Sequence, residues 1–240
     1  MRKMLSIILS LFIIPIFFTF FAFFLITVIL FSYIAHPRNT YSILAPLGAR
    51  IIMLSGLQYF SVRGSPPPKK DGPYLFMFNH ESMFDVLMLA GGIPYYINAI
   101  GWEGVFKIPL FGYMAKRYGA YPITHDNTDK AKQTLKIAEK ILLTDKDSMV
   151  LSPEGQRTIT GEMGEFKKGG FHFAKATNAT IVPVGLIGAY RANKRTSWII
   201  HPGRLTLVFG TPITSDQYFD LSVEQLRDLT REKIVSLVSS

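Results

Sequence analysis

A long uncharged segment at the N-terminus sets the strongest limit on what this chain can fold into. The run from Met4 to Ala35 contains no charged side chain. As one helix it would be about 48 Å long at 1.5 Å per residue, which exceeds the ~30 Å hydrocarbon core of a bilayer. Pro15 removes a backbone donor and disfavours a straight rod. We expect membrane insertion, either as a kinked, tilted span or as a re-entrant helical hairpin.

The residues that flank this segment leave its orientation open. Arg2 and Lys3 precede it and Arg38 follows it, so the balance of positive charge does not select one side. A cleaved signal peptide is disfavoured, because its apolar core is usually only about 7–15 residues long. A second helix is predicted at 41–58. It either lies in the membrane interface or packs as an ordinary core helix.

Composition narrows the classes of partner and of chemistry. The chain has 240 residues and a formal net charge of +9, which favours an anionic partner such as nucleic acid, acidic phospholipid or a phosphorylated substrate. We expect no nucleic-acid binding, because no recognisable nucleic-acid-binding motif accompanies the charge. The chain has no cysteine. Disulfides, cysteine–zinc sites and a thiol nucleophile are therefore excluded.

After a turn-rich connector, apolar runs alternate with helical patterns. Strands are predicted at 74–78, 95–100, 118–123, 148–151, 180–186 and 205–209, and helices at 85–90, 106–115, 129–143 and 169–177. Ser222 and Gln225 form a capping box before a C-terminal helix. Pro183 indicates an edge or a bulge in its strand. We expect an α/β fold, with a mixed sheet flanked by helices and an N-terminal membrane-embedded helical segment. Residues 1–60 would form the anchor and interfacial helix, and 61–240 a second domain.

The heptad NHESMFD interrupts two apolar runs with polar groups. His80 and Asp85 would lie about 140° apart on an ideal helix, so they meet only if His80 lies in the turn before the helix. Histidine titrates near neutral pH, and a carboxylate is the usual partner that orients a histidine base. Ser82 and Asp85 also fit a capping box, which is a purely structural alternative.

A second polar constellation, LSPEGQRT, directly follows a predicted strand. Arg157 projects from its turn, and arginine binds phosphate through two parallel hydrogen bonds. Gly155 permits the tight turn, and Glu154 either supports the loop or forms an ion pair within it. Lys167 and Lys168 follow downstream. The segment indicates an anion site or, alternatively, a solvated basic loop.

Taken in order along the chain, these two segments and two others resemble the four sequence blocks of the glycerolipid acyltransferase family. That family contains the 1-acyl-sn-glycerol-3-phosphate acyltransferases of bacterial phospholipid synthesis. Asn79, His80 and Asp85 match N-H-x-x-x-x-D. Residues 119–125 match G-x-I-F-I-x-R loosely, and residues 152–158 match F-P-E-G-T-R-S. Residues 182–184 match the apolar V-P-V strand. The resemblance extends from Tyr74 to about Ile213, and the N-terminal anchor is also typical of the family.

This resemblance implies transfer of an acyl group from acyl-CoA or acyl-carrier protein to a lysophosphatidate hydroxyl, giving phosphatidate. His80 would be the general base and Asp85 the residue that orients it. The substrate supplies the attacking oxygen, so Ser82 is a poor candidate for a nucleophile. The candidate substrate-binding residues are Asn79, Lys116, Arg117, His125, Glu154, Gly155, Arg157 and Lys167. Neither a metal nor a cofactor is expected beyond the acyl donor. The bilayer would be a partner, and the expected location is the bacterial inner membrane, with the catalytic domain on the cytoplasmic side.

Three positions depart from the family pattern. His125 stands where arginine is usual, Gly101 stands where many members have lysine, and Gln156 replaces threonine. Two of these changes remove cations that would contact the acceptor phosphate. An acyltransferase for a lyso-aminolipid or for lysophospholipid remodelling is therefore the alternative function. A non-catalytic membrane lipid-binding protein is the alternative outside enzymes.

Overall fold

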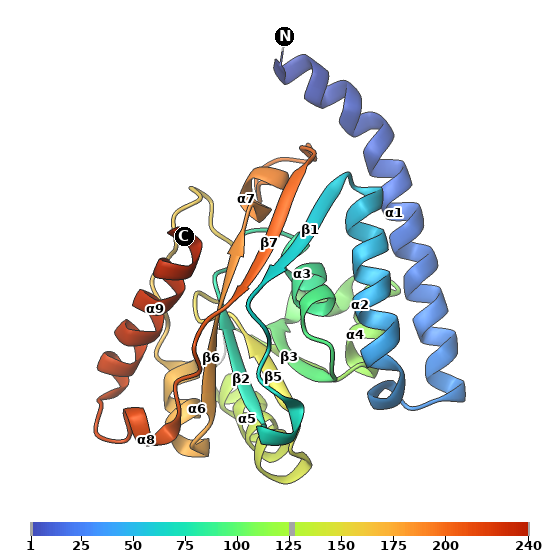
Figure 1. Cartoon of the computed structure of the whole chain (residues 1–240). Helices are drawn as coiled ribbons and strands as arrows, with labels where there is room; N and C mark the ends of the chain where they lie inside the picture. The colour runs from blue at the N-terminus through green and yellow to red at the C-terminus, as the bar shows by residue number, and fades with distance from the viewer. Residues whose placement is uncertain (1, 125–127, 240) are drawn as a thin grey trace.

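The fold is organised around one seven-stranded mixed sheet (Figure 1). The alternating pattern predicted a mixed sheet and six of these strands. A computed structural model describes residues 2–124 and 128–239. The strands are β1 (Gln58–Arg63), β2 (Tyr74–Phe78), β3 (Ile97–Trp102), β4 (Ala120–Ile123), β5 (Ser148–Leu151), β6 (Thr180–Ile187) and β7 (Gly203–Phe209). They lie in the order β1-β7-β6-β2-β5-β3-β4. Every neighbouring pair is parallel except β6 with β7.

Helices cover both faces of the sheet. The first face carries α1 (Arg2–Ile34), α2 (Pro37–Ser55), α3 (Phe84–Gly92) and the short α7 (Ala189–Ala192). The opposite face carries α5 (Thr128–Lys140), the helical turn η3 (Ile141–Asp145), α6 (Gly169–Thr177), α8 (Ser215–Tyr218) and α9 (Val223–Ser239). The turns η1 (Lys69–Asp71) and η2 (Glu103–Lys107) lie in connections, and α4 (Phe111–Arg117) packs against α1. The predicted capping box at Ser222 and Gln225 is confirmed by reciprocal hydrogen bonds.

The central strand β2 connects the two cores. All five of its residues are buried. Tyr74, Phe76 and Phe78 enter the core beneath α1–α3, whereas Leu75 and Met77 enter the core beneath α5, α6 and α9. Side chains of successive strand residues alternate between faces, so a fully apolar run is what a strand covered on both faces requires. The polar heptad follows where this run ends.

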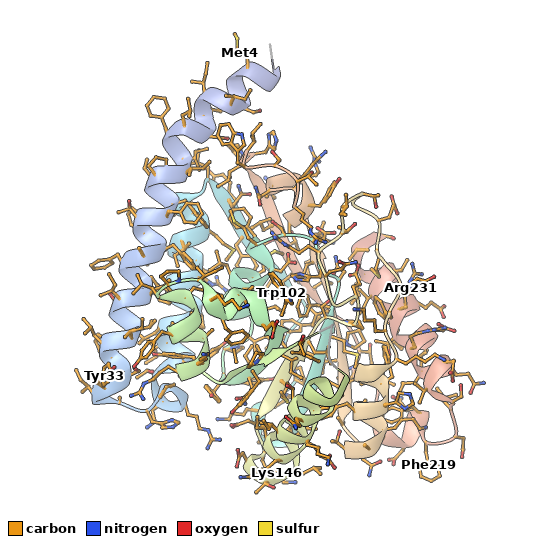
Figure 2. The ribbon with its side chains drawn as sticks, turned by 180° about the vertical axis from the view of Figure 1, so that it is seen from behind. Met4, Tyr33, Trp102, Lys146, Phe219 and Arg231 are labelled. Atoms are coloured by element: carbon orange, nitrogen blue, oxygen red, sulfur yellow. The ribbon has the colours of Figure 1, made fainter. Side chains whose placement is uncertain are left out.

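The N-terminal helix α1 pairs with α2 as an antiparallel hairpin along one side of the domain. It is continuous through Pro15 and changes direction in its N-terminal half (Figure 1). The part from Ser6 to Ile34 is long and apolar enough to cross a membrane. Figure 2 shows Met4 and Tyr33 near its two ends, with side chains projecting outward along the helix. The exposed apolar side chains of the hairpin include Leu11, Phe12, Phe23, Leu30, Ile43 and Leu47.

The opposite side of α1 contacts the α/β domain at both ends and in between. Ser10 exchanges hydrogen bonds of 3.1 Å with the backbone of Ile200, and the ring of Phe17 lies 5.5 Å from that of Phe84. Near the far end, Arg117 donates to the carbonyl of Ser32 over 2.7 Å. The helix is thus part of the first core and not a separate appendage.

The structure differs from the sequence-based elements in several places. The single helix predicted at 106–115 is two separate pieces, η2 and α4. The helix predicted at 41–58 is α2, which begins at Pro37 and ends at Ser55. The residues after it form an unpredicted edge strand, β1, within which the predicted domain boundary at residue 60 falls. Pro183 does not lie in an edge strand, since β6 has β2 and β7 on its two sides. It lies between the last β6–β7 pair and the bridge from Ile181 to Ile213, where the ladder is interrupted and no backbone donor is needed.

Candidate active site

His80 lies in the turn after β2, and its ring turns back to the first turn of α3. Its Nδ1 is 2.6 Å from Oδ2 of Asp85, which is fully buried. The ring packs edge-on against Phe78, with centroids 5.8 Å apart. Because Nδ1 faces the carboxylate, Nε2 is the ring nitrogen available to a substrate. The contact between His80 and Asp85 that the sequence required is therefore present.

The same carboxylate also fixes the turn that presents His80. Oδ2 of Asp85 accepts hydrogen bonds from the backbone N–H groups of Glu81 at 2.7 Å and Ser82 at 3.0 Å. Half of the capping box is thus formed, since the Asp85 side chain reaches back to the Ser82 backbone. The Ser82 hydroxyl instead donates to the carbonyl of Asn193 over 2.9 Å and is buried. This arrangement suits a structural hydroxyl and not an attacking one.

Glu154 holds the backbone of His80 from the loop that follows the neighbouring strand β5. Its Oε1 accepts from the His80 N–H and its Oε2 from the Gly164 N–H, both over 2.7 Å. Burial raises the pKa of this carboxyl, while the two backbone donors lower it. The N–H of Thr158 donates to the His80 carbonyl over 2.8 Å. Both backbone polar groups of His80 are thus fixed by the loop that begins at Ser152, in which Gly155 adopts a positive φ of 72°.

Asn79 and Glu81 connect the same turn to β6. The Asn79 side chain accepts from the N–H of Leu186 over 2.7 Å and donates to its carbonyl over 2.9 Å. Glu81 accepts from Asn79 and from the backbone N–H of Tyr190, and burial raises its pKa to about 7. The carboxyl ends of the parallel strands β2, β5 and β6 therefore converge at His80, where open α/β sheets usually bind their ligands.

Arg157 brings a positive charge to this end of the sheet. Its guanidinium is half-buried and makes no hydrogen bond or ion pair with the residues that the structure describes. Burial lowers its pKa, the charge of Asp85 raises it, and the charge of Arg195 lowers it again. Arg157 is therefore within electrostatic reach of both Asp85 and a second arginine, which the sequence did not single out.

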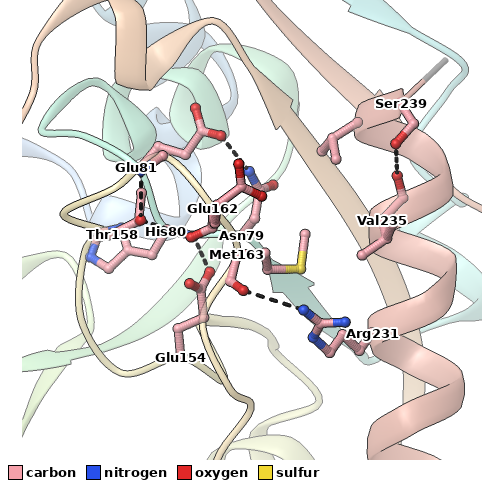
Figure 3. A pocket seen from close by; sticks show the side chains of 12 residues that line it. Asn79, His80, Glu81, Glu154, Thr158, Glu162, Met163, Arg231, Val235 and Ser239 are labelled. Atoms are coloured by element: carbon pink, nitrogen blue, oxygen red, sulfur yellow. Dashed lines mark hydrogen bonds between the residues drawn. The ribbon is translucent and has the colours of Figure 1, made fainter.

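A cavity of about 260 Å³ adjoins the turn on the α9 side. Figure 3 shows His80 and Arg231 on opposite sides of it, with Met163 between them. Its lining residues are Asn79, His80, Glu81, Glu154, Thr158, Gly161, Glu162, Met163, Arg231, Val235, Val238 and Ser239. Sequence patterns did not predict the residues of α9 here, because they belong to an ordinary amphipathic helix with no motif of its own.

The other predicted binding residues lie elsewhere. Arg117 binds Ser32 and stacks over Tyr33, and Lys116 beside it is exposed. Neither lines the cavity next to His80. The Lys167 side chain is exposed, and its backbone N–H donates to Pro153 over 2.8 Å. The predicted site residue His125 lies outside the described residues. Within residues 2–124 and 128–239, no group of three histidine or acidic side chains is placed to hold a metal ion.

Comparison of the sequence with known proteins identifies the family of this chain. The family model described as Acyltransferase matches residues 59–187, more than half of the chain. A 1-acyl-sn-glycerol-3-phosphate acyltransferase of Escherichia coli is 26% identical over 208 residues, covering 84% of this chain and 83% of that protein. Coconut and Limnanthes alba enzymes of the same name are 28% and 27% identical, covering 60% and 77% of this chain. The chain spans only 47% and 64% of the lengths of these two plant proteins.

The fold is shared with a solved structure over nearly its full length. The crystal structure of the 1-acyl-sn-glycerophosphate acyltransferase PlsC from Thermotoga maritima superposes with a TM-score of 0.80. The match covers 98% of this chain and 95% of the other, at 22% sequence identity. This confirms the predicted α/β architecture, and the family model confirms the resemblance seen in the four sequence blocks. The chain therefore belongs to the acyltransferase family.

Proposed function

We propose that this protein transfers a fatty acyl group from an acyl thioester to the free hydroxyl of lysophosphatidate, forming phosphatidate. The observation that carries the proposal is the 2.6 Å contact between His80 Nδ1 and the buried Asp85 carboxylate. The names of the relatives from Escherichia coli and plants support the choice of substrate. The donor is acyl-CoA or acyl-carrier protein, both of which carry the acyl group on a thiol.

The reaction uses the side of His80 that faces away from Asp85. Nε2 removes the proton of the acceptor hydroxyl as its oxygen attacks the thioester carbonyl, so that a C–O bond forms. When the tetrahedral intermediate collapses, the C–S bond breaks and the imidazolium returns the proton to the departing thiolate. Asp85 stabilises the imidazolium and holds the tautomer with Nε2 unprotonated. No enzyme nucleophile is needed, in agreement with the buried and engaged hydroxyl of Ser82.

An acceptor screen tests the substrate assignment. The purified protein would be given one labelled acyl-CoA or acyl-carrier protein and a panel of lysolipids that differ only in head group. We expect lysophosphatidate to be acylated at least about tenfold faster than the phosphodiester lysolipids or a lyso-aminolipid, because charge-assisted hydrogen bonds from Arg157 favour a dianionic phosphate. Preference for another head group would establish the alternative acyltransferase function. No transfer to any acceptor would favour the non-catalytic lipid-binding alternative.

We further propose that α1 and α2 attach the protein to one side of a membrane, with the apolar outer face of the hairpin in the lipid. If α1 crossed a bilayer, its contacts from Ser10 to Ser32 would span about 33 Å. That length is at least the ~30 Å thickness of the hydrocarbon core, so the α/β domain that packs against α1 would also lie in lipid. Attachment through α1 and α2 avoids this cost. This hairpin is not the re-entrant hairpin expected within residues 4–35, because α1 is one continuous helix through Pro15. The expected location remains the cytoplasmic side of a bacterial inner membrane.

Single cysteines test this arrangement, because the natural chain has none. Lys69→Cys marks the domain, Asn39→Cys marks the turn between α1 and α2, and Met4→Cys marks the beginning of α1; all three side chains are exposed. In sealed vesicles we expect a membrane-impermeant maleimide to label the first two from the same side. Met4→Cys should not be labelled from the opposite side before detergent is added. Labelling of Met4→Cys from the opposite side only would establish a span.

A further inference from the structure

The segment between α7 and β7 contributes an arginine to the loop that carries Arg157. Nη1 of Arg195 donates to the backbone carbonyl of Arg157 over 3.1 Å and to Oε1 of Gln156 over 3.3 Å. The same part of the chain makes a second bridge, in which the Tyr190 hydroxyl donates to the carbonyl of Ile159 over 3.0 Å. The two loops are thus fixed to each other, and the position of Arg195 beside Arg157 is built into the fold.

These contacts bring two positively charged side chains close together. Arg195 is close enough to Arg157 for charge repulsion to lower the pKa of Arg157. Neither guanidinium forms an ion pair with a carboxylate in the part of the chain that the structure describes. Holding two like charges close together costs free energy, and an anion with several acceptor oxygens would offset that cost. Both of these hydrogen bonds come from Nη1 of Arg195, so the N–H groups on Nε and Nη2 can bind a ligand.

The paired arginines also lie close to the reacting group. Arg157 feels the charge of Asp85, and the residue after it, Thr158, donates to the carbonyl of His80 over 2.8 Å. In lysophosphatidate the free hydroxyl and the phosphate are attached to neighbouring carbons of glycerol. A phosphate bound at the arginines therefore places that hydroxyl in the region of His80.

We propose that Arg195 is a second phosphate-binding residue, which together with Arg157 selects an acceptor that carries a phosphomonoester. The inference rests on the proposed function and deepens it, because it assigns the head-group specificity to a pair of arginines from two loops. Two guanidinium groups offer enough donors to bind the three terminal oxygens of a phosphomonoester. A phosphodiester lysolipid has only two such oxygens and one negative charge, so the second arginine gains less from it.

The test is to compare Arg195→Gln and Arg195→Lys with a neighbouring control, Arg191→Gln. Arg191 is exposed on α7 and belongs to no part of the site. For Arg195→Gln we expect KM for lysophosphatidate to rise by about 10- to 100-fold while kcat changes less than about threefold, since a charge-assisted contact to the ground-state phosphate is lost. Arg195→Lys should recover part of the increase, and Arg191→Gln should match the wild type.

If Arg195 only held the Arg157 loop in place and did not contact the phosphate, the kinetic constants would change in a different way. Glutamine ends two bonds short of Nη1, so Arg195→Gln would also lose a purely structural contact with the Arg157 carbonyl. Loss of that contact alone would raise KM for a phosphodiester lysolipid as much as for lysophosphatidate, whereas loss of a phosphate-binding residue raises KM mainly for lysophosphatidate. Unchanged KM in Arg195→Gln, or a fall in kcat without a rise in KM, would overturn the inference and leave the proposed function intact. A wild-type protein that does not acylate lysophosphatidate would overturn both. Titration of a soluble short-chain lysophosphatidate into His80→Ala, with and without Arg195→Gln, should show the same 10- to 100-fold loss of affinity without any turnover.

Discussion

His80→Ala is expected to reduce acyl transfer to lysophosphatidate by about 10³-fold or more. The substitution removes the only group in the turn with an unengaged nitrogen, Nε2, that can take the hydroxyl proton, and general bases contribute about 10²–10⁴-fold. It also leaves the buried carboxylate of Asp85 without its charged partner during the reaction. The released donor thiol reports the rate directly with a thiol reagent, and the absence of cysteine from the chain removes any background from the protein itself.

His172→Ala is the matched control for this experiment. His172 is exposed on α6, on the face of the sheet opposite α3, and has no part in the proposed site. It should release thiol at the wild-type rate, and both variants should retain the wild-type circular dichroism spectrum. Equal thiol release by His80→Ala and the wild type would refute the assignment of His80 as the base. A loss of activity in both variants would mean that the measurement reports folding and not chemistry.

The local features of the fold around β2 and the turn after it could be predicted from the sequence. The apolar run of β2 requires cover on both faces, and the polar heptad after it can only be a turn that opens a helix. Because the five-residue spacing prevents His80 and Asp85 from sharing a helix face, their contact required His80 to lie just before the helix. The structure has this arrangement. These features depend on neighbours within a few residues, which is the range over which sequence patterns carry information.

The contacts that hold the site together depend on strand order and could not be predicted. Glu154 binds the backbone of a residue 74 positions earlier, which is possible only because β5 lies beside β2 in the sheet. Asn79 reaches Leu186 only because β6 lies on the other side. The sequence suggested that Asn79 and Glu154 bind substrate, whereas the structure shows their polar atoms engaged with the backbone. Their role as substrate ligands stays a prediction.

The same limit applies to the cations of the site. The sequence indicated a loss of positive charge at Gly101 and His125, and the arginine beside Arg157 comes from another loop, 38 residues away. No spacing rule connects Arg195 with Arg157, because the connection runs through β6 and α7. Similarly, the apolar run of α1 was read as a membrane segment, but its packing against Ile200 and Phe84 depends on the completed sheet.

Asp85→Asn is expected to impair acyl transfer far less than Asp85→Ala, because the turn dictates the orientation of the amide. In the wild type, Oδ2 of Asp85 accepts hydrogen bonds from the N–H groups of Glu81 at 2.7 Å and Ser82 at 3.0 Å. In Asp85→Asn the amide oxygen must therefore occupy the position of Oδ2, because the amide nitrogen cannot accept these bonds. His80 then still finds an acceptor for Nδ1–H and keeps Nε2 unprotonated. Only the negative charge that stabilises the imidazolium is lost. We expect thiol release to fall about 10- to 100-fold in Asp85→Asn and about 10³-fold or more in Asp85→Ala.

The orientation of the amide has a measurable cost in stability. Its nitrogen takes the place of Oδ1, which is buried and has no hydrogen-bond partner among the residues that the structure describes. A buried donor without an acceptor costs about 1–3 kcal/mol, so Asp85→Asn should melt below the wild type, and Asp220→Asn on the surface should not. If instead Asp85→Asn were as inactive as Asp85→Ala, the amide nitrogen would face His80 and force the wrong tautomer. The two backbone donors would then not control the orientation of residue 85. Activity above that of Asp85→Ala, together with a lowered melting temperature, would show that the turn and not the charge alone sets the state of the catalytic histidine.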